Sequence, residues 1–106
     1  MLFDKSLFIK KNGHFLYNKL CDFVDCEINK TSCNDIIFII SSENLKSFLY
    51  EGNQYIIIKD ENRSEIIIVD EVSREFGVND SQSVIRIDRN ELLELIQKKK
   101  ESLHFF

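Results

Sequence analysis

The sequence predicts a small α+β fold: a mixed or antiparallel sheet of four to five strands, packed by two main helices at about 14–28 and 89–101. The length of 106 residues suits one domain, so we expect a single domain spanning 1–106. Hydrophobic residues make up 43% and charged residues 30%, a globular composition. Segments with helical periodicity also alternate along the chain with short β-branched segments, which favours a sheet packed by helices.

The first predicted elements are a short strand at 6–11 and the helix at 14–28. The helix is amphipathic, with its apolar stripe formed by Leu16, Leu20, Phe23 and Val24. The pair Asn12-Gly13 leaves an alternative open, because Asn-Gly between apolar runs is also a strong hairpin signal. In that case 8–9 would pair with 16–17, but the apolar stripe favours the helix.

The next segment predicts a central strand followed by a short helix. Residues 36–40 are five consecutive β-branched or aromatic residues without alternation, which is typical of a strand covered on both faces. Ser42 suits the N-cap of a short helix over about 43–50, where apolar residues recur at helical spacing. Gly52 would end that helix.

A hairpin is predicted from two apolar strands at 55–59 and 65–69, because the polar loop 60–64 has the length that joins antiparallel neighbours. In the segment 70–80, Val72 and Phe76 have helical spacing but Gly77 follows at once. A single helical turn and an ordered loop both fit.

The chain ends with a predicted strand and the second main helix. Residues 84–88 alternate, with Ile85 and Ile87 on one face. Asp88 suits the N-cap of the helix at 89–101, and Glu91 three residues later completes a capping-box pattern. The basic run 98–100 lies near the helix C-terminus, where positive charge is favourable.

The residues that carry chemistry form no pattern typical of an enzyme. Cys21, Cys26 and Cys33 are spaced by five and seven, unlike zinc ligands, and we expect reduced thiols with Cys33 the most reactive. Neither His14 nor His104 has a spacing that predicts a catalytic triad. The three glycines are isolated, so no phosphate-binding loop is predicted. We therefore expect no catalytic residue, no metal and no cofactor.

The chain also lacks signals for membranes and nucleic acid. The longest apolar run, 36–40, is far shorter than the roughly 18 residues of a membrane span, and no secretory signal is visible at the N-terminus. We expect a cytoplasmic protein with no membrane contact. The formal net charge of −4 disfavours direct nucleic-acid binding.

The charge distribution is the most informative feature. Residues 20–80 carry thirteen acidic against five basic side chains, while both flanking segments are net positive. Within 60–80 there are seven acids and two arginines. Solubility alone explains such a charge equally well. If it is functional, the predicted partner-binding residues are the acids and aromatic Asp60, Glu61, Asp70, Glu71, Glu75, Phe76 and Asp80.

Three hypotheses follow. The leading one is a small bacterial immunity protein or antitoxin whose acidic surface neutralises a basic, nuclease-type toxin. The alternative is a phage-encoded inhibitor of a host defence nuclease, in which clustered carboxylates imitate nucleic acid. The third is a homodimeric subunit that associates through a sheet edge or the Phe105-Phe106 tail, or an enzyme that uses Cys33 or a carboxylate pair.

Overall fold

The computed structural model describes residues 3–42, 48–59 and 64–103, and it confirms the predicted α+β class. The elements in chain order are α1 (Lys5–Asn12), α2 (His14–Glu27), α3 (Cys33–Ser41), β1 (Phe48–Glu51), β2 (Tyr55–Lys59), β3 (Glu65–Asp70), α4 (Glu71–Glu75), α5 (Asp80–Ser83), β4 (Val84–Asp88) and α6 (Arg89–Ser102). The two main helices at 14–28 and 89–101 are confirmed as α2 and α6.

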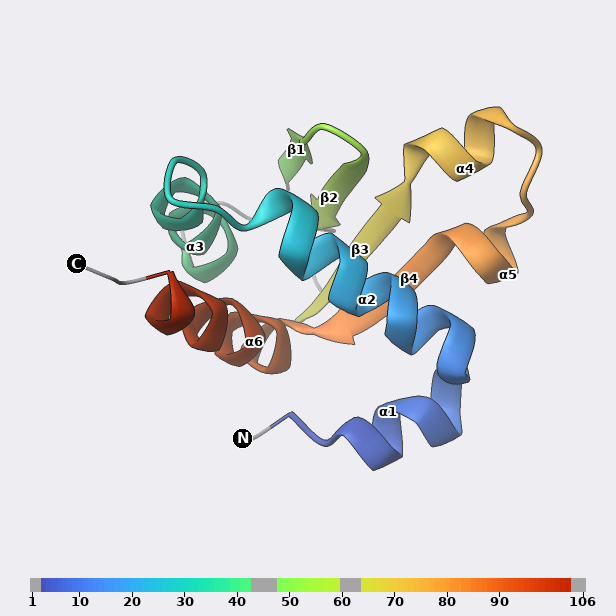
Figure 1. The fold of residues 1–106 in the computed structure, drawn as a ribbon, viewed down its shortest axis with the longest axis horizontal. Helices are drawn as coiled ribbons and strands as arrows, with labels where there is room; N and C mark the ends of the chain where they lie inside the picture. The colour runs from blue at the N-terminus through green and yellow to red at the C-terminus, as the bar shows by residue number, and fades with distance from the viewer. Residues whose placement is uncertain (1–2, 43–47, 60–63, 104–106) are drawn as a thin grey trace.

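The sheet is an antiparallel meander with strand order β1-β2-β3-β4 (Figure 1). The predicted strands at 55–59, 65–69 and 84–88 are confirmed as β2, β3 and β4, and β2 pairs with β3 as expected. Of the predicted connecting loop, residues 60–63 lie outside the described residues.

One face of the sheet packs against the helices. Its buried side chains come from β2, β3 and β4. The helices α1, α2, α3 and α6, together with Ile28 after α2, supply the rest of one continuous core. The fully buried members include Tyr55, Ile57, Ile66, Ile68 and Ile85 from the strands, and Leu20, Phe23, Ile36, Ile40, Leu92 and Ile96 from the helices.

The predicted strand at 6–11 is wrong, because this segment forms α1. The Asp4 carboxylate accepts a hydrogen bond from the Leu7 amide and caps the helix. Gly13, at φ 91°, ends α1 and leads directly into α2. Asn12-Gly13 therefore joins two helices, and the hairpin alternative is wrong as well.

The predicted central strand at 36–40 is also wrong, because these residues belong to α3. Ile36 and Ile40 are buried four residues apart, whereas Phe38 between them is 68% exposed, which is helical periodicity. A run of five apolar residues fits a strand and a helix equally well. Of the predicted helix at 43–50, residues 43–47 lie outside the described residues and 48–50 form part of β1.

The segment 70–80 contains short helices, in keeping with the predicted helical turn. Asp70 caps α4 by accepting a hydrogen bond from the Ser73 amide, and Gly77 follows at φ 85°. The predicted cap of α6 is confirmed, since the Asp88 carboxylate accepts from the amides of Asn90 and Glu91.

Candidate functional site

The turn between β1 and β2 wraps around a buried carboxylate. Glu27, the last residue of α2, accepts backbone hydrogen bonds from Asn53 at 3.0 Å, Gln54 at 2.8 Å and Tyr55 at 3.0 Å. A Cβ atom at Gly52 would overlap the Glu27 carboxylate, so this close approach favours glycine. The carboxylate is thus satisfied by neutral amides and fixes residues 52–55 against α2.

A second buried carboxylate fixes the start of α4. Asp70 accepts from Lys19 Nζ at 2.6 Å, from Ser73 Oγ at 2.8 Å and from Gln54 Nε2 at 3.3 Å. Burial by itself would raise the pKa of Asp70, but the hydrogen bonds from Lys19, Ser73 and Gln54 outweigh it and lower the pKa. The ionised carboxylate therefore connects α2, the β1–β2 turn and α4.

These two anchors hold the walls of a hollow of about 360 Å³, which we call the acidic hollow. The amide of Glu71 donates to the carbonyl of Gln54 at 3.0 Å, which brings α4 beside the β1–β2 turn. The lining residues are Glu51, Gly52, Asn53, Gln54, Ile56, Glu71 and Glu75. Within the part of the chain that the structure describes, none of the three glutamates forms an ion pair with a Lys or Arg side chain.

The helix α4 presents an apolar edge next to its acidic one. Glu71 and Glu75 are four residues apart, as are Val72 and Phe76, so each pair lies on one side of the helical turn. Phe76 is 82% exposed. Aromatic side chains are enriched in protein interfaces, so an exposed phenylalanine here is available to a partner.

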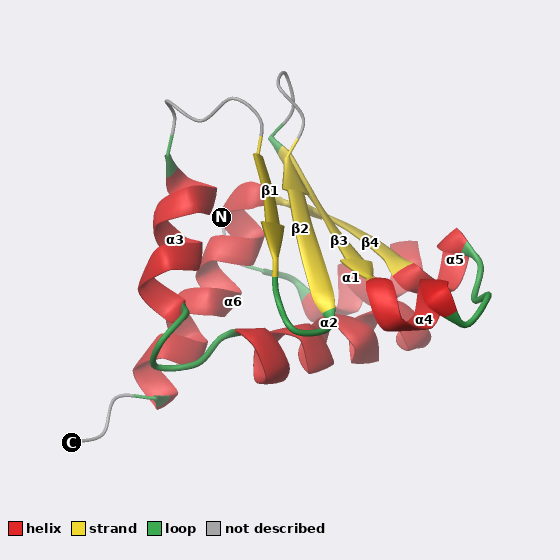
Figure 2. Cartoon of the chain, turned by 90° about the horizontal axis from the view of Figure 1, so that it is seen from above, coloured by secondary structure: helices red, strands yellow, loops and turns green. Residues whose placement is uncertain are grey.

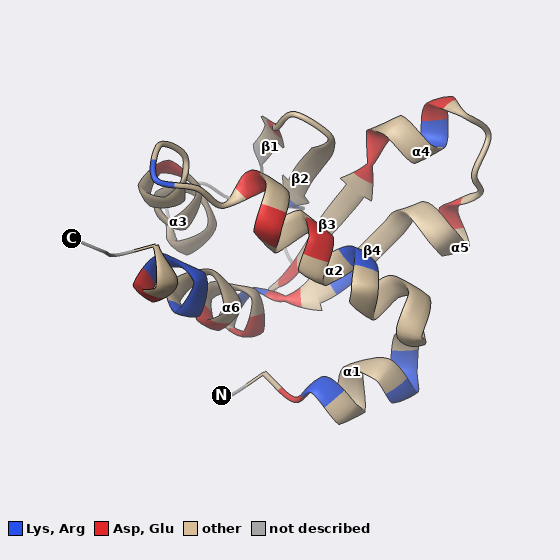
Figure 3. Ribbon diagram, viewed as in Figure 1, with Lys and Arg blue, Asp and Glu red and all other residues tan. Residues whose placement is uncertain are grey.

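The structure brings most of the predicted partner-binding residues to this side of the molecule. Glu71, Glu75, Phe76 and Asp80 lie on α4, α5 and their connection, where Figure 3 shows acidic positions. Asp80 lies 3.7 Å from exposed Arg74. Asp70 lies beneath this surface, buried and engaged, while Asp60 and Glu61 fall outside the described residues.

Glu51 is a residue of the hollow that the sequence did not indicate. It lies about twenty residues before Glu71 and at the end of β1, a segment predicted as a helix. Its strand pairing brings it to the hollow, since Glu51 lies opposite Ile56 in the β1–β2 register. Only knowledge of that register would have identified it.

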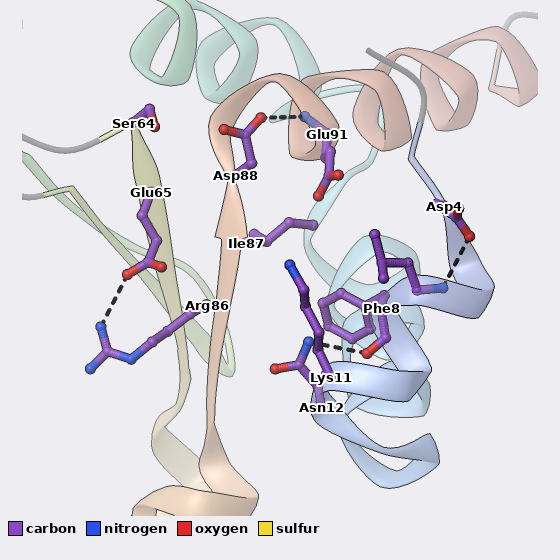
Figure 4. Close-up of a pocket in the computed structure, with 11 residues that line it drawn as sticks. Asp4, Phe8, Lys11, Asn12, Ser64, Glu65, Arg86, Ile87, Asp88 and Glu91 are labelled. Atoms are coloured by element: carbon purple, nitrogen blue, oxygen red, sulfur yellow. Dashed lines mark hydrogen bonds and ion pairs between the residues drawn. The ribbon is translucent and has the colours of Figure 1, made fainter.

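A different hollow, of about 440 Å³, lies between α1 and β4 (Figure 4). Most of its charged groups are already engaged. Asp4 and Asp88 cap helices, and Arg86 lies 3.3 Å from Glu65. The mixed charges of this hollow select no single class of ligand, so it supports no functional assignment.

The side chains with catalytic potential are engaged in structural contacts. Lys19 is ion-paired with Asp70, and the Ser73 hydroxyl donates to the same carboxylate, so Lys19 is unsuited to act as a base toward Ser73. The hydroxyl of buried Tyr55 donates a hydrogen bond to the Asp22 carboxylate at 2.5 Å. Burial is the larger cause, and this hydrogen bond the second, that raises the pKa of Tyr55.

The expectation that Cys33 is the reactive thiol is wrong, because Cys33 is buried at the start of α3. Cys26 is exposed, but desolvation and the neighbouring Asp22 carboxylate raise the pKa of the thiol and disfavour the thiolate. His14 begins α2, and His104 lies outside the described residues.

Over residues 3–42, 48–59 and 64–103, no group of three His, Cys, Asp or Glu side chains is arranged to hold a metal ion. In the same residues, no helix combines the length and apolarity needed to cross a membrane. Comparisons with protein-family models, with curated proteins and with solved structures find no match to this chain.

Proposed function

We propose that this chain is a small acidic binding protein that docks onto a basic protein and inhibits it. The acidic hollow carries the proposal, because three glutamates converge there from β1 and α4 while Phe76 projects beside them. The inhibitor is of the immunity or antitoxin kind, and its target is a nuclease-type toxin in the same cytoplasm.

The charges of the site favour such a target. A nuclease carries a positive surface for phosphate, and opposite charges on two proteins accelerate their encounter. A guanidinium group that enters the hollow can form paired hydrogen bonds with a carboxylate of Glu51, Glu71 or Glu75. Occupation of the toxin's basic cleft then excludes its substrate.

The aromatic edge of α4 supplies the second part of the interaction. Phe76 can stack on a cationic side chain or enter an apolar pocket of the target, and burial of an aromatic anchor slows dissociation. The acids therefore contribute mainly to the association rate, and Phe76 mainly to the lifetime of the complex.

The acidic part is tested by capture of the target with the tagged chain from its native cell, followed by association kinetics with the purified target. The double variant Glu71→Lys/Glu75→Lys should lower the association rate constant at low salt by at least about tenfold. The control Asp35→Lys/Glu101→Lys makes the same change in net charge at exposed sites elsewhere. Equal effects of the two variants, or a target whose nuclease activity survives binding, would overturn the proposal.

The aromatic part is tested with Phe76→Ser in the same assay. Dissociation should accelerate by at least about tenfold, because an interface anchor is lost. The free energy of unfolding should change by less than about 0.5 kcal/mol, since Phe76 is exposed. Phe38→Ser, which removes a similarly exposed ring from α3, serves as the control and should leave the dissociation rate unchanged.

A further inference from the structure

The sheet has a second face that no described helix covers. Figure 2 shows α3 and α6 beside the strands and α2 below them. Strand β3 shows the division most clearly. Ile66 and Ile68 belong to the core, whereas Ile67 points to the other side and is partly exposed.

The middle of this outer face is apolar, and charged residues lie at its edges. The strand register aligns its side chains in two rows that run across all four strands, Glu51-Ile56-Val69-Val84 and Leu49-Ile58-Ile67-Arg86. The row beyond Arg86 brings Glu65 opposite Asp88. Antiparallel sheets that face water normally alternate apolar and polar residues. Strands β2 and β3 do not alternate, and this pattern is typical of strands covered on both faces.

The exposure of the outer face fits a surface that lacks its cover. Leu49 is 59% exposed, and Ile56, Ile58, Ile67 and Val84 are partly exposed. Val69 is the exception, since it is buried without belonging to the core cluster, at the end of the sheet next to α4. The open area is therefore centred on the row of Leu49, Ile58 and Ile67.

The two charged residues of these rows lie at opposite edges of the sheet and have opposite signs. Glu51 is on β1 and Arg86 is on β4, in neighbouring rows. A two-fold axis parallel to the strands would lay β1 of one copy over β4 of another. This rotation brings Glu51 of each copy near Arg86 of the other. Two equivalent pairs result, with apolar side chains between them. Over these two rows the face is thus complementary to itself in both charge and apolarity, while Glu65 and Asp88 lie in the row beyond Arg86.

We propose that the outer face binds a second copy of this chain, so that two sheets pack face to face in a homodimer. Sheets pack in this way in β-sandwiches, with their strands nearly aligned and their side chains interdigitated. Arg86 is available for the contact, because its side chain is 55% exposed and its pair with Glu65 lies at the surface. The interface excludes Glu71, Glu75 and Phe76 but shares Glu51 and Ile56 with the rim of the acidic hollow. The dimer is argued and tested without reference to the proposed inhibitory function.

Sedimentation of the whole purified chain over a range of concentrations tests this interface. The expected mass at high concentration is twice the 12.5 kDa of the chain, falling to the monomer mass on dilution. The highest concentration should be on the order of several hundred micromolar, because a specific interface should associate below it. A monomer mass at every concentration would overturn the proposal.

A matched pair of leucines locates the interface. Leu49→Asp places a charge in the middle row of the outer face and should abolish the dimer at concentrations where the wild type associates. Leu7→Asp makes the same change on α1, at a leucine that is 45% exposed, and should leave the dimer intact. Circular dichroism of both variants checks that they are folded. A folded Leu49→Asp dimer would overturn the proposal.

A charge swap tests the orientation with residues that the fold does not need. Arg86→Glu places a carboxylate near Glu51 of the other copy. The repulsion should weaken the dimer by about tenfold or more. The double variant Glu51→Arg/Arg86→Glu reverses both partners and should restore the dimer to within about threefold of the wild type. If the double variant remains as weak as Arg86→Glu, the proposed pairing is wrong.

Discussion

The two faces of the sheet are built from neighbouring isoleucines in the chain, yet they have different roles. Ile57 and Ile68 point to the helices and are almost fully buried, while Ile58 and Ile67 point to the other side and stay partly exposed. The helices need only the inner set to form the core. The hydrophobicity of the outer set is therefore evidence of an interaction beyond folding.

The carboxylates follow the same division. On the inner side, Glu27 and Asp70 are buried and fully supplied with hydrogen-bond donors. On the outer side, Glu51, Glu71 and Glu75 form no ion pair with any cation of the described residues. The inner groups thus stabilise the fold, whereas the outer groups are available to the partner that we propose.

The largest difference between the faces should be seen with Ile68→Ala and Ile67→Ala. Ile68→Ala removes fully buried methyl groups and should lower the free energy of unfolding by about 3–4 kcal/mol. Ile67→Ala should lower it by about 1 kcal/mol or less, because its side chain is already partly in water. Urea denaturation at a protein concentration that keeps the chain monomeric measures both. Equal losses would show that the outer face is as important for folding as the core.

A smaller effect is expected on the inner side from Lys19→Met. Among the described residues, Lys19 is the only basic side chain that forms an ion pair with Asp70. Leaving this carboxylate buried without its cation should destabilise the fold by about 2–3 kcal/mol at neutral pH. Lys10→Met, at an exposed lysine of α1, is the control and should change stability by less than about 0.5 kcal/mol.

The pH dependence identifies the cause of that loss. The pKa of Asp70 is lowered in the folded protein, so its stabilising contribution is complete above the ordinary value of 3.8 and disappears as the pH falls through the lower folded value. In Lys19→Met the hydrogen bond that lowers the pKa of Asp70 most is lost while burial still raises it, so the pKa should be higher than in the wild type. The stability difference between wild type and variant should therefore shrink as the pH falls below 3.8. A gap of constant size from pH 7 to pH 3 would assign the loss to packing of the lysine chain.

The elements that the sequence predicted correctly carry strong local signals. Strands β2 and β3 are β-branched runs separated by a polar loop, and Asp88 marks the start of α6 by its capping chemistry. The segment of α3 lacks such a signal, because a short apolar run satisfies both helical and strand spacing. Its capping position holds no side-chain hydrogen bond that could have decided the matter.

The candidate site was predicted only in part, for a related reason. Glu71, Glu75 and Phe76 are close in sequence, so their clustering in one acidic segment was visible. Glu51 reaches them through the register of β1, and Glu27 reaches the turn at 53–55 across more than twenty-five residues. Contacts of this range depend on the tertiary fold, which local patterns do not specify.

Gly52 links the inner and outer sides of the sheet. It lies against the buried Glu27 carboxylate and also lines the acidic hollow. Gly52→Ala places a methyl group against a carboxylate that three amides hold in place, and we expect a loss of about 1–2 kcal/mol in unfolding free energy. The neighbouring exposed Asn53→Ala should have a smaller effect. Glu27→Ala removes the carboxylate that the new methyl group would meet. In that background, Gly52→Ala should hardly change the free energy of unfolding. Urea denaturation of the wild type, the two single variants and the double variant measures this non-additivity. If the two losses in unfolding free energy are additive, the effect of Gly52→Ala does not depend on Glu27. Glu27 would then not fix the turn that lines the hollow.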